Sequence, residues 1–238
     1  MANRKQWRAI GLTTVPSWEH IVRNTKVYSA VAGSVMVLGA LAYAGGGTAV
    51  ATDKGDGDGS RVHVDGRLNT LNNSGASGHA HVRADHRRLK VDVDVRHVLK
   101  GQPHAMHIHY GNKARNECPT VGKDDTNGDF RIETVEGAPA YGPVRVSLTT
   151  SGDTSAKSVL AIDRFPTAPK GAIHYDRHTK TSKNVARGVR QGEAVVVVHG
   201  VDYNGNGKYD FRGGGKSDLD PSLPAEATDP AACGVLHR

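Results

Sequence analysis

The stretch LKVDVDVRHV, residues 89–98, decides the fold class of this chain. Apolar and charged residues alternate along it with a period of two, and successive side chains of an extended backbone point to opposite faces. One face therefore carries Leu89, Val91, Val93 and Val95, and the other carries mainly charge. A strand of this kind is typical of an antiparallel sheet that has one side in water.

Similar patterns surround this stretch. Residues 79–85 (HAHVRAD) alternate in the same way, and the link His86-Arg87-Arg88 is short enough for a hairpin. Val62 and Val64 belong to an earlier strand, and further strands are predicted at 144–149, 158–162 and 171–175. The four valines at 195–198 predict a strand that is buried on both faces, with His199 just past its end.

The composition supports a fold built from strands. The chain has 238 residues with 29 Gly and 10 Pro but only 3 Phe and 2 Trp, which suits short strands joined by many turns. No segment combines helical periodicity with capping residues, and the tail at 201–238 is predicted to be mostly irregular. We therefore expect an all-β fold, a Greek-key β-sandwich or flattened barrel of about 7–8 antiparallel strands with long glycine-rich loops.

The N-terminal part has the features of an export signal. Residues 27–52 carry no charge, and Ala49-Val50-Ala51 provides the small residues of a signal-peptidase site, which predicts cleavage before Thr52. A membrane anchor at 27–44 is the alternative, because this apolar run is nearly long enough to span a bilayer. We expect a signal peptide at 1–51, a flexible linker at 52–60 and the folded domain of a secreted protein at 61–238. Membrane contact is expected only through an uncleaved N-terminal segment.

Charge and cysteine content narrow the function classes. The formal net charge of +7 falls to +3 without residues 1–51, which hold five Lys/Arg and one Glu. The sequence has no stripe of Lys and Arg with interleaved aromatics, so we expect no nucleic-acid partner. The two cysteines, Cys118 and Cys233, most simply form one disulfide in an exported chain.

A histidine-rich stretch, PHAMHIH at 103–109, indicates a metal site. His107 and His109 stand two residues apart on a predicted strand, so their imidazoles point the same way, and convergent imidazoles suit copper or zinc. The alternative is a solvated strand face that carries histidines. His104 is a further candidate ligand, although its spacing from His107 puts it on the opposite face unless the strand is bulged.

The order of four short motifs resembles the copper–zinc superoxide dismutase family. AMHIH at 105–109 is followed by Cys118 in a loop, then by Val197-Val198-His199, and finally by ACGV at 232–235. The resemblance implies that His107, His109 and His199 bind copper, that Cys118 pairs with Cys233, and that superoxide is the substrate. Residues 78–109 also resemble the CHRD domain, which would imply a non-catalytic extracellular module with a binding or structural role.

Two features of the dismutase family are missing from the sequence. No histidine occurs between His109 and His174, so the copper–zinc bridge and the other zinc ligands have no counterpart, and a zinc site is not expected. The arginine that guides superoxide in the family is replaced by Pro230. His174 and His178 are the only mid-chain replacements for the bridge.

Three other groups of polar residues have both a metal-binding and a plain structural interpretation. His79 and His81 repeat the two-residue spacing, but the apolar face of their strand is the other one, so a solvated face is expected. Oxygen-bearing side chains at positions 1, 3, 5 and 9 of a tail segment match the front of a calcium loop: Asp202, Asn204, Asn206 and Asp210. Position 12 is Gly213 rather than Glu, so a tight Asn-Gly turn without an ion is the alternative. The acidic residues at 124–129 allow the same two interpretations.

Two functions stay open on this basis. The first is a secreted protein that binds one copper ion at His107, His109 and His199 and that, if it is an enzyme, is an oxidoreductase with weak superoxide dismutation. In this case Asp202 or Asp210 is the expected acceptor for the ring N–H of His199, on the nitrogen that does not bind the metal, because histidine ligands normally have such a partner. The second function is the non-catalytic CHRD-like module.

Overall fold

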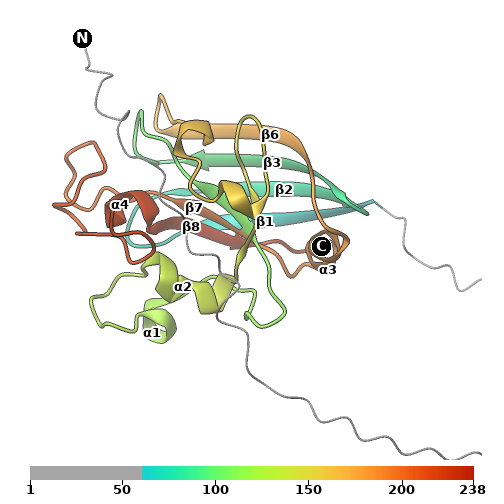
Figure 1. Ribbon diagram of the computed structural model, residues 1–238, viewed down its shortest axis with the longest axis horizontal. Helices are drawn as coiled ribbons and strands as arrows, with labels where there is room; N and C mark the ends of the chain where they lie inside the picture. Colours follow the sequence, from blue (N-terminus) through green and yellow to red (C-terminus); the bar gives the residue numbers. More distant parts are fainter. Residues whose placement is uncertain (1–60) are drawn as a thin grey trace, which may run out of the picture. The chain divides into compact units, whose positions relative to one another are not determined.

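The computed structural model describes residues 61–238 (Figure 1). The predicted signal peptide, the alternative anchor and the linker lie outside the described residues. Within 61–238, none of the helices combines the length and the apolar character that crossing a membrane would require.

Eight antiparallel strands form one curled sheet in the order β5-β4-β7-β8-β1-β2-β3-β6. The strands are β1 (Val62–Thr70), β2 (Ser77–Asp85), β3 (Arg88–Arg96), β4 (Met106–His109), β5 (Val144–Ser147), β6 (Ala172–Lys180), β7 (Val195–His199) and β8 (Pro230–Val235). The predicted all-β fold is thus confirmed. β3 pairs with β6 and β4 with β7, so the chain crosses three times between the two halves of the sheet, after β3, after β5 and after β6, as in Greek-key connectivity.

One hydrophobic core lies between two four-stranded halves of this sheet. The first half is β1-β2-β3-β6 and the second is β5-β4-β7-β8, and they meet where Asn69 pairs with Cys233 and Thr70 with Ala232. Inward side chains of both halves belong to a single buried cluster, which includes Val64, Val91, Ile108 and Val196. Each half therefore has one face toward the core and one face away from it, and the candidate functional side chains lie on the outer faces.

The alternating stretch at 89–98 forms β3 for the expected reason. Leu89, Val91, Val93 and Val95 are fully buried, while the residues between them are exposed or half-buried. β3 ends at Arg96, because His97 adopts a left-handed φ of 61° that an extended strand cannot include.

The valine run forms β7, which lies between β4 and β8. Val196 and Val198 point into the main core, whereas Val195 and Val197 pack on the outer face against Tyr141 and the disulfide. Burial on both faces confirms the prediction for this strand. His199 is the last residue of β7 rather than the first residue after it.

The helices contradict the expectation that none would form. α1 (Val121–Asp124), α2 (Thr134–Tyr141), α3 (Lys183–Gln191) and α4 (Ala225–Thr228) lie in the connections between strands. Ser182 caps α3 by accepting the N–H of Val185, and Gly192 ends this helix with a left-handed φ of 78°. The strand predicted at 158–162 is also wrong, because η2 (Ala156–Ser158) and η3 (Ile162–Arg164) form two short helical turns there.

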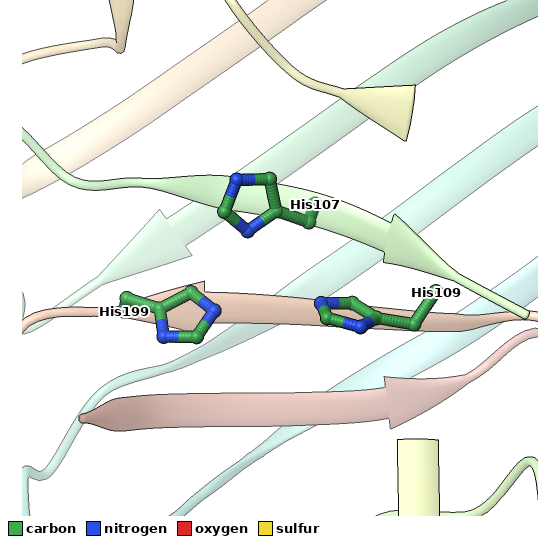
Figure 2. Close-up of side chains that lie close together, drawn as sticks. All are labelled: His107, His109 and His199. Carbon is green, nitrogen blue, oxygen red and sulfur yellow. The ribbon is translucent and has the colours of Figure 1, made fainter. Parts of the chain in front are cut away.

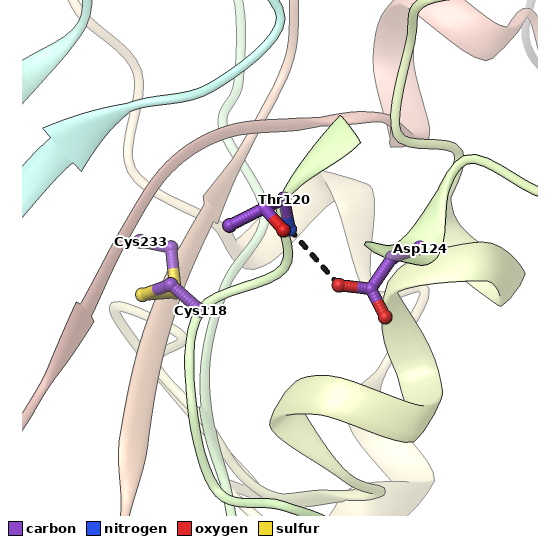
Figure 3. Close-up of a disulfide and its surroundings, with 4 residues drawn as sticks. All are labelled: Cys118, Thr120, Asp124 and Cys233. Atoms are coloured by element: carbon purple, nitrogen blue, oxygen red, sulfur yellow. Dashed lines mark hydrogen bonds between the residues drawn. A yellow bond between two sulfur atoms is a disulfide. The ribbon is translucent and has the colours of Figure 1, made fainter. Parts of the chain in front are cut away.

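The predicted disulfide joins Cys118 and Cys233, whose Cα atoms lie 5.7 Å apart (Figure 3). Cys118 belongs to the segment between β4 and α1, and Cys233 lies in β8. The tail was expected to be mostly irregular, but its end forms β8 because this segment completes the sheet between β7 and β1. The disulfide therefore fastens the long connection after β4 to the outer face of the sheet.

Candidate metal centre

Three predicted ligands meet on the outer face of the half-sheet β5-β4-β7-β8. His107 and His109 lie on β4, and His199 ends the neighbouring strand β7. A ring nitrogen of each lies within 4.8 Å of a ring nitrogen of the other two. Figure 2 shows the three imidazoles turned toward one another above these strands. The period-two alternation of both strands produces this arrangement, because the intervening Ile108 and Val198 point into the core.

One ring nitrogen of each histidine faces a backbone carbonyl. Nε2 of His107 lies 3.2 Å from the oxygen of Val159, Nδ1 of His109 lies 2.7 Å from that of Gly142, and Nδ1 of His199 faces that of Thr228. A carbonyl only accepts hydrogen bonds, so each of these nitrogens donates its N–H. Each neutral imidazole therefore keeps a lone pair on its other nitrogen.

Those other nitrogens have no hydrogen-bond partner. They are Nδ1 of His107, Nε2 of His109 and Nε2 of His199, and all three are buried. A buried polar atom normally has a partner, because leaving it unpaired costs about 1–3 kcal/mol. Three such atoms that face one another in one cluster are therefore unusual. A single ion bound between them would satisfy all three.

Burial keeps these imidazoles neutral. Their residues are only 3%, 3% and 4% exposed for His107, His109 and His199. Desolvation lowers the pKa of His109 to about 3 and that of His199 to about 4. Desolvation, with added repulsion from the two neighbouring imidazoles, lowers the pKa of His107 well below its usual value. Neutral imidazole is the form that binds a metal, so the three donors are ready at neutral pH.

Aromatic side chains cover the cluster. The ring of Tyr141, at the end of α2, packs on His109 with centroids 4.5 Å apart, and Phe165 meets His107 edge-on at 5.3 Å. The Tyr141 hydroxyl donates to the carbonyl of Thr134, so it points away from the imidazoles. These contacts fix the rings of the two β4 histidines and exclude bulk water.

His104 does not join the cluster. Its Nδ1 lies 3.0 Å from the carbonyl oxygen of His199 and its Nε2 lies 3.0 Å from that of Leu99, while the Tyr209 hydroxyl lies 3.0 Å from Nδ1. Both ring nitrogens thus have partners within the protein. His104 packs behind the backbone of His199 and acts as a structural group there.

The acceptor for His199 differs from the expected one. Thr228, at the end of α4, supplies the carbonyl, whereas the carboxylates of Asp202 and Asp210 accept hydrogen bonds from their own loop. The prediction that one of these aspartates would orient His199 is wrong. The backbone carbonyls of Gly142, Val159 and Thr228 orient the three imidazoles instead. Every residue has a backbone carbonyl, so the sequence could not indicate which ones would do so.

The calcium-like loop is closed by hydrogen bonds within the protein. The Asp202 carboxylate accepts the N–H groups of Asn206 and Gly207, and the Asp210 carboxylate accepts the side-chain amides of Asn204 and Asn206. The fully buried Glu226 was not predicted; it accepts the N–H groups of Tyr203 and Asp210 and fixes the base of the loop. These hydrogen bonds explain why the segment at 202–210 forms a tight turn. The acidic segment at 124–129 is similar, because Asp125 accepts the N–H groups of Gly128, Asp129 and Phe130.

The remaining histidines singled out from the sequence lie elsewhere. His79 and His81 are exposed on β2, which confirms the expected solvated strand face. His174 and His178 are exposed on β6, in the half-sheet that does not carry the three-histidine cluster. Neither takes the place of a bridging histidine beside His107.

Comparisons of the chain with protein-family models and with curated proteins found no match.

Proposed function

We propose that this chain is a secreted copper-binding protein related to copper–zinc superoxide dismutase, with one copper ion at His107, His109 and His199. The observation that carries the proposal is the set of three buried ring nitrogens that lack partners and face one another. Each imidazole is oriented by an N–H donated to a carbonyl, which is the usual arrangement around histidine ligands.

The donor set favours copper over other ions. Three neutral nitrogens without a carboxylate or thiolate exclude a good site for calcium or magnesium, which prefer oxygen. Three imidazoles suit Cu(I) in three-coordinate geometry or Cu(II) with added water, and copper binds a given set of nitrogen donors more tightly than zinc. His104, whose two ring nitrogens already have partners, supplies no fourth ligand.

Three further features support the likeness to the dismutase family. The H-x-H pair and the histidine after the valine run lie on adjacent strands, β4 and β7. The disulfide joins the segment after the H-x-H pair to the ACGV strand, as the family resemblance implies. The connectivity of the sheet is of the Greek-key type. The disulfide also supports an oxidising location, because such bonds form and persist mainly outside the cytoplasm.

The protein environment suggests slow turnover if the site is catalytic. Bound copper would supply one-electron oxidation and reduction. The chain itself would hold the three nitrogens in place and keep them neutral, but it leaves them only 3–4% exposed. Pro230, at the position of the family's guiding arginine, is buried in β8 and carries no charge. Attraction of superoxide and delivery of its two protons would therefore both be weak.

A non-catalytic role is the second candidate, and the same burial favours it. Tyr141 and Phe165 close over the imidazoles, which would slow access for a diffusing substrate. A CHRD-like extracellular module that stores copper or uses it for stability would need no access beyond that of the metal. In this second candidate function, copper still binds to His107, His109 and His199, but the protein does not turn over superoxide.

Copper titration of the metal-free full chain tests the ligand assignment. We expect one copper ion per chain, measured by metal analysis, and nitrogen hyperfine structure in the electron paramagnetic resonance spectrum of the Cu(II) form. The single variant His199→Gln should weaken binding, and the triple variant H107A/H109A/H199A should abolish it. His104→Gln is the matched control, because it replaces a buried histidine of the same region that is not a ligand; its copper stoichiometry should stay at one.

Copper binding that is unchanged in the triple variant would refute the assignment. A superoxide assay on the copper-loaded protein then separates the two candidates. Slow but copper-dependent turnover supports the dismutase-like function, and no turnover supports the non-catalytic module. A rate near the diffusion limit would contradict the argument from burial and from Pro230.

A further inference from the structure

A second group of metal-binding side chains lies on the outer face of β1-β2-β3-β6, the half-sheet that the proposed copper site does not use. Backbone pairing places His79 of β2 opposite Asp94 of β3, and Asp94 opposite His174 of β6. Three neighbouring strands therefore carry a row of His, Asp and His. Asp92 lies two residues before Asp94 on the same face of β3.

Three of these four residues have donor atoms that lie close together. Asp92, Asp94 and His174 each offer one ligand atom within 4.8 Å of the other two. Nδ1 of His174 lies 2.9 Å from Oδ1 of Asp94. His79 stands directly opposite Asp94, and opposed residues of antiparallel strands have Cβ atoms about 4.5–5.5 Å apart, so rotation of its side chain would bring a further imidazole toward the group.

Solvent reaches the row from two sides. His79 and Asp94 line one surface hollow, and Asp94 and His174 line a second one. The His174 side chain is 68% exposed and that of Asp94 is 59% exposed. An ion could therefore enter without any rearrangement of the backbone, and only side-chain rotation would be needed to bring the donors to bonding distance.

We propose that this face binds a divalent transition-metal ion of the zinc type through Asp92, Asp94 and His174, with His79 as the fourth donor. Imidazole nitrogen and carboxylate oxygen are common zinc ligands, and four-coordinate sites are the rule for this ion. Two carboxylates also balance the double positive charge. Calcium or magnesium would leave the two imidazoles unused, because both prefer oxygen ligands.

The site is independent of the three-histidine cluster. Its strands are β2, β3 and β6, whereas the cluster lies on β4 and β7, and the two outer faces are separated by the hydrophobic core. Its exposed position leaves room for water ligands and rapid exchange of the ion. Arg67 and Arg96 line the hollow beside His79, and their positive charge opposes cation binding. We therefore expect exchangeable rather than permanent binding.

Zinc titration of the metal-free full chain by equilibrium dialysis tests the proposal. His174→Ala and Asp94→Asn should each remove one zinc equivalent or weaken its binding at least tenfold. His63→Ala is the matched control, because His63 is exposed on the same sheet face but lies opposite Arg83 rather than an aspartate. Its zinc isotherm should coincide with that of the unmodified chain. Zinc bound at the three-histidine cluster would appear equally in all four proteins, so it does not affect the comparison.

Nuclear magnetic resonance of the imidazole nitrogens gives a second measurement that does not depend on variants. Zinc should shift the ring signals of His174 and His79 and leave those of His63 in place. An unchanged isotherm for both His174→Ala and Asp94→Asn would overturn the proposal. The absence of a zinc-induced shift in the ring signals of His174 would also overturn the proposal.

Discussion

Replacing His109 with glutamine should change how the stability of the metal-free protein depends on pH. Folded His109 has a pKa of about 3, because burial disfavours its charged form. An unfolded histidine has a pKa near 6.5. Between these two values the unfolded chain binds a proton that the folded chain does not, so the free energy of unfolding decreases as pH falls through this window.

The size of the effect follows from the separation of the two pKa values. Each pH unit below about 6.5 costs the folded state about 1.4 kcal/mol for this histidine, so that going from pH 7 to pH 5 costs about 2 kcal/mol. Glutamine does not titrate, and its amide can still donate to the carbonyl of Gly142. His109→Gln should therefore gain about 2 kcal/mol relative to the unmodified protein over this pH range.

Urea unfolding in the presence of a chelator, at pH 7 and at pH 5, measures this gain. Other buried groups, such as Asp229, titrate in both proteins and cancel in the difference. Met106→Leu is the matched control, because it changes a buried residue of the same strand without an ionisable group. Its stability difference should be the same at both pH values. A difference for His109→Gln that also stays constant would show that the cluster is not held neutral by burial.

Three further predictions concern other parts of the molecule. Replacing both Cys118 and Cys233 with serine should lower the free energy of unfolding by at most about 5 kcal/mol, because the bond closes a long loop; no loss in urea unfolding would mean that the disulfide does not form. Burial raises the pKa of Asp229 to about 7, so between about pH 4 and pH 7 the folded state holds a proton that the unfolded state has released, and stability falls as pH rises through this range. Asp229→Asn should thus gain about 2–3 kcal/mol over the unmodified protein between pH 5 and pH 8, and an equal difference at both pH values would contradict this reasoning. Ser182→Ala should cost about 1 kcal/mol through loss of the α3 cap, whereas Ser222→Ala, at an exposed turn, should cost less in the same thermal unfolding assay.

The sequence predicted the sheet well because strand burial has a direct signature. Alternation identified the central strands β2 and β3, and the valine run identified β7. α3 was missed because its apolar residues are few, although Ser182 before it and Gly192 after it are typical capping residues. Val185 and Val189 stabilise it by packing on the sheet, and a tertiary contact of this kind is not visible in a local pattern. The strand predicted at 158–162 fails because its residues follow a Ser155-capped turn and pair with no neighbouring strand.

The sequence predicted the histidines of the candidate metal site, but it did not predict the groups that orient them. Spacing on one strand identified His107 and His109, and the resemblance to the copper–zinc superoxide dismutase family added His199 at the end of the valine strand. The groups that orient them are backbone carbonyls from three connections, and their position depends on how α2, η2 and α4 pack. His104 was left as a candidate because sequence spacing gives no information on the carbonyls of Leu99 and His199 that face its two ring nitrogens.

The pairing of β1 with β8 also has a consequence for the order of events during biosynthesis. The first and last strands must meet before the sheet is complete, and such long-range pairing makes folding slow. β7 carries His199 and is held between β4 and β8, so the three imidazoles converge only after the C-terminal residues have been synthesised. A nascent chain that has not yet formed β8 has no assembled cluster. Any metal ion that the cluster binds is therefore taken up only after the chain has folded.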